Sequence, residues 1–431
     1  MKNILIAIRS IFKKGRHNVM KIVSLGIGLA VGLVLIAKVY FEQSYDDFYP
    51  DRDRVYQVWA KYQQNGGELK DYPQTSGGIA PTMQQQIPEI ETVTRYTSFG
   101  DWTFTMTDTK MKYSGRCIIA DSCFFDILPR PMLIGNAKEV LSTPMYVLIS
   151  SRIAKNIGGD VIGKNFTVDN SPGRTMTIGG VFEEVPENSH SRYDVIVSMA
   201  SAGRFMWEGS PTNMLGNDRY ISYVKLHKGV NPLALEEQVR TFVNSYFPPE
   251  EQQKVGLSID FSFHKLDNLH KELPQVKRMT WILSLLAFAL IFTAVMNYIL
   301  IVISSIVNRS KEVAVHKCYG ASENNIHGMM FGEALVHIVL SLILALLLIL
   351  AFRGTVEELL ATSLDSLLLS NGSLVLLGIC ILVFFVSGFM PGSLYARIPV
   401  ASAFRNYREN KRIWKKALLL VQFVATGFLV T

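Results

Sequence analysis

Several short segments of this 431-residue chain contain residue types that could do chemistry. Residues 158–165, Gly-Gly-Asp-Val-Ile-Gly-Lys-Asn, have the spacing of a phosphate-binding loop, in which backbone amides hold phosphates and a lysine reaches the outermost one. Asn165, however, stands where such a loop needs a serine or threonine to bind magnesium, and the residues after it indicate a strand instead of a helix. We therefore interpret this segment as a glycine turn before a strand, and we do not expect the chain to hydrolyse ATP.

Histidine and serine give no better catalytic pattern. His190, His264 and His270 lie in a long polar stretch, without a His-Glu-x-x-His motif, a cysteine pair with zinc spacing or a Gly-x-Ser-x-Gly motif. Ser10 and Lys13 match Ser-x-x-Lys by chance, because the companion motifs are missing. We expect ordinary surface histidines and predict no catalytic residue, no metal ligand and no cofactor-binding residue, which disfavours an enzyme.

The apolar runs of the chain are distributed asymmetrically, and they predict the elements that hold these residues. One run covers 22–41, and three more cover 281–307, 329–352 and 373–390. Each can cross a hydrocarbon core of ~30 Å, which takes about 20 helical residues. We predict a membrane protein with four transmembrane α-helices, one plus three, and a large extracytoplasmic α+β domain inserted between the first two. A fifth run, 417–431, is expected to start another transmembrane helix.

The first run is an anchor in our interpretation and not a cleaved signal peptide. Its apolar core exceeds the usual ~7 to 15 residues of a signal peptide. The residues at its end, Tyr40, Phe41 and Glu42, are not the small residues that a cleavage site needs.

Basic residues flank the runs on one side only. Residues 1–21, 308–328 and 391–416 are basic, whereas the loop 353–372 has one arginine and three acidic residues. Lysine and arginine in short loops stay in the cytoplasm, so we predict a cytoplasmic N-terminus and a periplasmic block at 42–280, in a bacterial inner membrane. The net charge of +7 is therefore a signal of topology, and nucleic acid is excluded as a partner.

The four cysteines are too few for a disulfide framework. In the predicted topology Cys318 is cytoplasmic and Cys380 lies within the membrane, so only Cys117 and Cys123 can meet an oxidant. A bridge between these two and a pair of unpaired buried thiols both fit the sequence, and we favour the thiols.

The external block is long enough to bury a core of its own. Stretches rich in β-branched and aromatic residues predict strands at 54–62, 102–107, 165–169, 175–182, 193–199, 219–226 and 257–266. Helical spacing predicts helices at 79–86, 150–157 and 232–247, the last of them after a cap at Asn231. A helix between strands at the end of the block, with a strand-rich middle, predicts two subdomains.

Three polar side chains fall within predicted spans. Asn297 is expected to hydrogen-bond a neighbouring helix, because an unpaired amide in lipid is costly. Glu333 and His337 lie four residues apart on one helix face, where we favour structural pairing or snorkelling over a proton relay.

The strongest signal lies between the second and third apolar runs, at residues 308–322. This segment predicts an amphipathic helix that leaves the membrane, ends at Gly320 and is followed by a helix capped by Ser322. Its apolar residues fall on one side: Ile306, Val307, Val313 and Ala314. Physical reasoning alone leaves equal room for a connector that simply ends in water, because basic helices beside membranes are common.

Residues 309–322 resemble the Arg-x-x-Glu, hydrophobic, basic, Gly-Ala-Ser signature of the MacB/FtsX-type ABC transporter permeases. The resemblance implies that this segment is a coupling helix that docks on a cytoplasmic ATPase. The residues to which it assigns this role are Arg309, Lys311, Glu312, Val313, Ala314, Val315, His316, Lys317, Gly320, Ala321 and Ser322.

Other segments are similar to the same family. Residues 178–182 with 185–190, and 150–154 with 162–164, resemble its periplasmic core domain, and 396–401 with 404–405 resemble the elbow after its fourth span. Together the similarities cover nearly the whole chain.

Residues 404–431 repeat the arrangement of 8–35, a basic segment that leads into an apolar run. The chain therefore looks like the N-terminal half of a duplicated eight-span member, and Tyr45-Asp-Asp-Phe-Tyr49 resembles permeases of Bacteroidetes-type bacteria. We expect the sequence to end before the protein does.

The resemblance implies a non-catalytic permease that couples ATP hydrolysis by a partner to movement of its periplasmic domain, for export or extraction of a substrate. ATP and magnesium would be bound by the partner ATPase. The other implied partners are the lipid bilayer, a second permease copy or second half, and a periplasmic adaptor with an outer-membrane channel. The alternative is an FtsX-like regulator that activates an extracytoplasmic enzyme.

Overall fold

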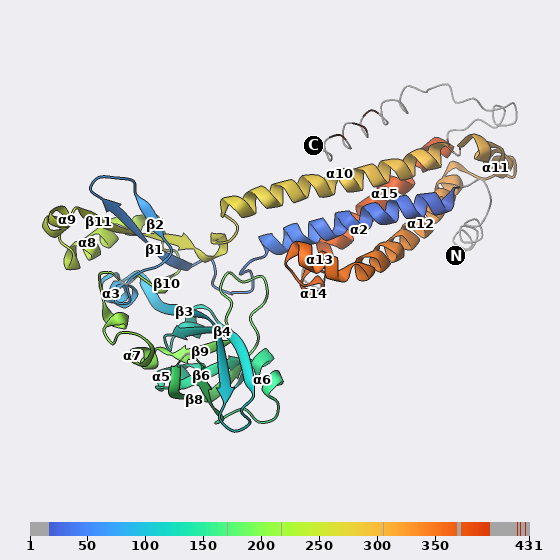
Figure 1. Cartoon of the computed structure of the whole chain (residues 1–431). Coiled ribbons are helices and arrows are strands. Elements are labelled where there is room, and N and C mark those ends of the chain that lie inside the picture. Colours follow the sequence, from blue (N-terminus) through green and yellow to red (C-terminus); the bar gives the residue numbers. More distant parts are fainter. Residues whose placement is uncertain are drawn as a thin grey trace. The chain divides into compact units, whose positions relative to one another are not determined.

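The computed structural model describes residues 17–169, 171–216, 218–304, 306–368 and 372–396, with Leu420, Phe423 and Gly427. The chain divides into two compact units, Met1–Gln43 with Pro274–Thr431 and Ser44–Leu273 (Figure 1). The predictions for residues 1–16 and 397–416, and for the fifth span at 417–431, lie outside the described residues apart from the three isolated positions.

The first unit is a bundle of long apolar helices, and within its described residues three helices are long and apolar enough to cross a membrane. They are α2 (Asn18–Gln43), α10 (Pro274–Ser304) and α12 (Glu323–Ala351). The fourth predicted span corresponds to α15 (Ser373–Ala396), within which Leu374–Ser387 is a shorter apolar stretch, so the count of four spans stays a prediction. Shorter helices connect them: α11 (Ile306–Cys318), α13 (Arg353–Leu360) and α14 (Leu364–Leu368).

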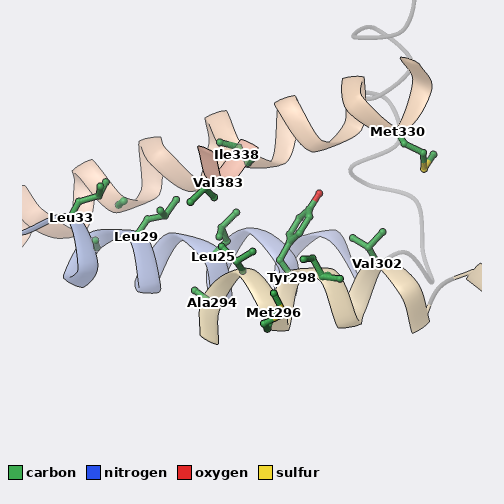
Figure 2. Close-up of a cluster of buried hydrophobic side chains, with 14 of the residues drawn as sticks. Leu25, Leu29, Leu33, Ala294, Met296, Tyr298, Val302, Met330, Ile338 and Val383 are labelled. Atoms are coloured by element: carbon green, nitrogen blue, oxygen red, sulfur yellow. The ribbon is translucent and has the colours of Figure 1, made fainter. Parts of the chain in front are cut away.

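Helix α2 packs closely against α10 because glycines face that helix. A Cβ atom at Gly28 would stand 2.2 Å from Cβ of Ala294, and one at Gly32 would stand 2.4 Å from Cγ1 of Ile291. Small residues four apart let two helix backbones approach, so that dispersion contacts can hold helices together in lipid. Figure 2 shows the core beside this contact, where Leu25 and Leu29 of α2 lie between α10 and α12.

The second unit is built on one mixed sheet of 11 strands, ordered β11-β1-β10-β3-β4-β9-β6-β8-β5 (Figure 1). Strand β2 pairs with β1, and β7 pairs with β3 and β8. The bounds are β1 Val55–Gln64, β2 Lys70–Tyr72, β3 Ile90–Met106, β4 Lys112–Ala120, β5 Met132–Ile134, β6 Tyr146–Ser150, β7 Asn165–Val168, β8 Ser171–Phe182, β9 Val195–Ser198, β10 Ile221–Leu226 and β11 Leu257–Lys265. Each predicted strand is found here, and the division into two subdomains stays a prediction.

Helices cover this sheet around three apolar cores. One core packs α3 (Ile79–Gln86) and α8 (Glu236–Tyr246) on β1, β10 and β11. The others lie around β4, β6, β8 and β9, beside the short helices α4 (Phe124–Ile127), α5 (Ala137–Ser142), α6 (Ser151–Ile157) and α7 (Ala202–Phe205). Helix α9 (Pro249–Val255) precedes β11.

The three predicted helices of this unit are confirmed, one of them in two pieces. Ser150 caps α6 by accepting a hydrogen bond from the amide of Ile153. Asn231 accepts one from the amide of Leu233, as predicted, but the helix after it is a 3-10 turn at Pro232–Leu235 followed by α8.

The interpretation of residues 158–165 as a glycine turn is also confirmed. Gly158, Gly159 and Gly163 all have a positive φ, and β7 begins at Asn165. No helix follows that could direct amides at a phosphate, so the segment is a connection between α6 and the sheet.

Candidate functional site

The predicted coupling segment forms a tight helix–turn–helix. Helix α11 ends at Cys318, and Gly320 adopts a φ of +85°, a left-handed conformation that glycine reaches without a steric cost. The amide of Ala321 donates to the carbonyl of His316 and that of Gly320 to the carbonyl of Lys317, at 3.0 Å each. These are the two hydrogen bonds of a Schellman motif, which satisfies carbonyls left over at a helix end.

The next helix begins at once. Ser322 adopts an extended conformation, and its side chain accepts a hydrogen bond from the amide of Asn325, which caps α12 as predicted. Four residues therefore separate the two helices, and each end of the turn is fixed by its own cap.

One side of α11 is locked into the bundle. Val313 and Ala314 are each 1% exposed and belong to the same apolar core as Ile326 and Met330 of α12. The predicted apolar side is confirmed at these two positions. The side chains of Ile306, Val307, Arg309 and Lys311 lie outside the described part of the chain.

The opposite side faces solvent. Val315, His316 and Cys318 are exposed, and Tyr319, at the top of the turn, is 89% exposed. An aromatic ring held out by a rigid turn is a typical anchor for a protein partner. Tyr319 is absent from the residues predicted for this site, although its place directly before the helix-ending glycine could have indicated it.

Polar contacts within the bundle are structural. The hydroxyl of Tyr298 in α10 lies 3.2 Å from Nδ1 of buried His337 in α12, and Ser341 donates to the carbonyl of Ile22 in α2. His337 therefore joins two helices, which agrees with a structural role, and the pairing with Glu333 stays a prediction. The prediction for Asn297 stays a prediction.

A buried ion pair lies at the C-terminal end of α2. Nζ of Lys38 is 2.6 Å from a carboxylate oxygen of Glu42 and donates to the hydroxyl of Thr362 at 2.7 Å. Because both charged side chains are nearly inaccessible to solvent, the pair compensates for the cost of removing each charge from water.

The residues that follow α2 are tied to the sheet by a buried network. Asp46 is 0% exposed, and its carboxylate lies 2.7 Å from Nδ1 of His190, whose Nε2 lies 2.5 Å from the hydroxyl of Tyr223 in β10. Asp46 also accepts a hydrogen bond from Ser189 and adopts a φ of +60°, an uncommon conformation for a residue other than glycine. The expectation of a surface histidine is wrong for His190, because its ring bridges Asp46, in the segment after α2, and Tyr223 of the sheet.

The other two histidines stack on aromatic rings. His270 lies parallel to Tyr45, with ring centroids 3.4 Å apart. His264 stacks on Trp59, and burial lowers its pKa below the usual range of a histidine. Both rings contribute to packing, which the sequence pattern did not indicate.

Four charges form a closed ring that joins the two ends of the second unit. Asp47 pairs with Lys271 and Arg52, and Asp267 pairs with the same two cations, at N···O distances between 2.8 and 3.5 Å. Each such pair near the surface is worth only ~0.2–1 kcal/mol, but a network shares the entropic cost of ordering its members. The segment after α2 and the segment before α10 are thus bound to each other.

Among the residues that the structure describes, no three His, Cys, Asp or Glu side chains are grouped so as to hold a metal ion. The arrangement described above offers an exposed, rigid turn on the bundle and a cross-linked pair of segments at the ends of the sheet unit.

Residues 284–400 match the protein family described as FtsX-like permease C-terminal. A solved domain of a permease protein from Porphyromonas gingivalis is 33% identical, with a TM-score of 0.46. The match covers 50% of this chain and 91% of that domain. The extracellular domain of the noncanonic ABC-type transporter YknZ, from Gram-positive bacteria, is 11% identical, with a TM-score of 0.34. The match covers 48% of this chain and 98% of the YknZ domain. No curated protein matches the chain. Both superpositions are too loose to carry an argument, so the relationship depends on sequence.

Proposed function

Because residues 284–400 match the FtsX-like permease family, we propose that this chain is the membrane subunit of an ABC-type transporter of the MacB/FtsX type, whose ATPase is a separate polypeptide. ATP and magnesium are bound by that partner. The permease converts the closure of the ATPase into movement of its extracytoplasmic domain, which exports or extracts a substrate.

The observation that carries this proposal is the rigid turn between α11 and α12. Val313 and Ala314 anchor it in the bundle core, while Tyr319 stands almost fully in solvent. A push on the exposed side is passed to the bundle instead of being absorbed by the loop, because the Schellman motif and the Ser322 cap fix both helix ends. The coupling residues predicted from sequence lie in this turn and on the helix before it.

The ends of the sheet unit support the same proposal. The chain passes from α2 at Gln43 directly into the segment that holds Asp46 and Asp47, and from Lys271 into α10, which begins at Pro274. The ion-pair ring joins these segments, and Asp46 and His190 connect them to β10. Movement of either helix would reach the sheet through fixed contacts.

The proposed orientation predicts a distinct pattern of cysteine labelling. Cys318 is exposed and cytoplasmic in this proposal, so a membrane-impermeant maleimide should label it in inside-out vesicles and leave it unlabelled in spheroplasts. Cys117 should react in neither, because it is buried and burial raises the pKa of its thiol well above the usual range. Gln253→Cys, on the exposed surface of the sheet unit, is the control and should be labelled in spheroplasts. The reverse labelling pattern would show that the topology is opposite to the proposed one.

The proposal is tested by purifying the full chain from native membranes and asking whether an ABC ATPase co-purifies and hydrolyses ATP faster in the complex. We expect both results. An ATPase of this class encoded beside the chain that neither binds nor responds would refute the proposal. Co-purification of a cell-wall hydrolase would instead favour the regulatory alternative. The second permease copy or second half, and an adaptor with an outer-membrane channel, are further proposed partners.

A further inference from the structure

A charged cleft of about 320 Å³ lies at one edge of the large sheet. Strands β6 and β8 are parallel and end at this edge, and β9, antiparallel to β6, begins there beside Cys117 of β4. The topology therefore brings together Arg116 of β4, Arg152 after β6, Glu184 after β8 and Asp194 before β9.

The floor of the cleft is fixed by Asp194. Its carboxylate lies 2.6 Å from Nη2 of Arg152 and accepts a hydrogen bond from the amide of Arg116 at 2.9 Å. A Cβ atom at Gly115 would stand 2.9 Å from Cβ of Asp194, so this approach of β4 depends on glycine. Asp194 and Arg152 form an ion pair with each other, so we do not expect either to be the main ligand-binding group.

The rim differs from the floor because its charges are only weakly paired. The side chain of Arg116 is 54% exposed, and its ion pair with Asp101 spans 3.9 Å. Arg192 is exposed and donates to the backbone carbonyl of Glu187 at 2.8 Å. The carboxylate of Glu184 lies 3.4 Å from Nε of Arg152 and is still 53% exposed. The exposed parts of Arg116, Arg192, Asp101 and Glu184 thus keep much of their capacity to bind a ligand.

We propose that this cleft binds a small zwitterionic ligand, with a free carboxylate and a free ammonium group, of the size of a short peptide. Pockets for small ligands begin at about 300 Å³. The carboxylate would bind Arg116 and Arg192, since guanidinium groups form strong paired hydrogen bonds to carboxylates. The ammonium group would bind Asp101 and Glu184. A purely anionic ligand would be repelled by these two carboxylates, and a purely cationic one by the arginines.

The inference does not depend on the proposed transport function, and its test needs no ATPase. Triglycine, N-acetyl-triglycine and triglycine amide are titrated into the full chain in nanodiscs, and binding is followed by isothermal calorimetry. We expect triglycine to bind and each blocked form to bind at least tenfold more weakly, because each lacks one of the two charges. Free glycine, titrated in parallel, distinguishes an amino-acid ligand from a peptide.

Arg116→Gln and Arg192→Gln should each weaken triglycine binding about tenfold. Arg204→Gln, an exposed arginine outside the cleft, should leave binding unchanged. Both cleft arginines are exposed, so the variants should unfold at the temperature of the parent chain, which a thermal scan checks. The inference is overturned if triglycine does not bind at 10 mM, if the three tripeptides bind equally, or if both cleft variants bind like the parent. A negative result in the tripeptide titration would not change the outcome expected in the ATPase experiment.

Discussion

A Tyr319→Ala variant is expected to reach the membrane in normal amounts and to lose most of the ATPase stimulation that the parent chain gives. The ring is 89% exposed, so its removal should change the free energy of unfolding by less than about 0.5 kcal/mol. A buried aromatic anchor in an interface is typically worth ~2 kcal/mol or more, which corresponds to at least a thirtyfold weaker complex. The measurement is the ATPase rate of the reconstituted complex as a function of permease concentration.

Two comparisons make this result specific. Leu359→Ala removes an apolar side chain that is 78% exposed on α13, away from the turn, and should leave ATPase stimulation unchanged. Ala314→Leu, unlike Tyr319→Ala, should lower the free energy of unfolding, because Ala314 is 1% exposed and added volume in a packed core costs ~1–3 kcal/mol. Glu312→Lys should reduce coupling if the acidic residue contacts the partner. Normal stimulation with both Tyr319→Ala and Glu312→Lys would contradict the assignment of this turn.

Gly28→Val is expected to cause the largest loss of stability in the bundle. Its Cβ atom would stand 2.2 Å from Cβ of Ala294, which has no flexible side chain that could turn away, so α2 and α10 must separate. Such overpacking costs about 3 kcal/mol, and the midpoint of thermal unfolding in detergent should fall by about 5–10 °C. Fluorescence of a thiol-reactive dye during heating measures this midpoint.

A matched glycine elsewhere in the bundle provides the control. Gly378 lies in α15, and nothing stands within 4 Å of a Cβ atom built there. Gly378→Ala should therefore be neutral, or slightly stabilising because alanine favours the helix. An equal midpoint for Gly28→Val and the parent chain would show that α2 and α10 do not pack as described.

The sequence predicted the elements whose signals are local. The long apolar helices, the Gly320 ending and the Ser322 cap follow from hydropathy and from residues a few positions apart. Strand β3 was predicted only at 102–107, because its pattern is broken by a bulge at Ser98 and Gly100, where the register with β4 shifts. Strand β4 was missed because Gly115 interrupts it, and that glycine is explained only by its distant neighbour Asp194.

The parts of the site that escaped prediction depend on contacts between distant residues. His190 and Asp46 are 144 positions apart, and nothing in either segment indicates the partner. The ion-pair ring joins Asp47 to Lys271 across almost the whole second unit. The apolar side of α11 was predicted at Val313, whereas the exposure of the Tyr319 ring is seen only in the folded turn.

The stacking of Tyr45 on His270 also bears on how such a protein can be rearranged in evolution. Residues near the two ends of the sheet unit touch, so the chain enters and leaves this unit at neighbouring points. A segment with adjoining termini can be excised, or replaced by a homologous one, without stretching the host helices. A chimaera that accepts a foreign module between Gln43 and Pro274 should therefore still insert its helices.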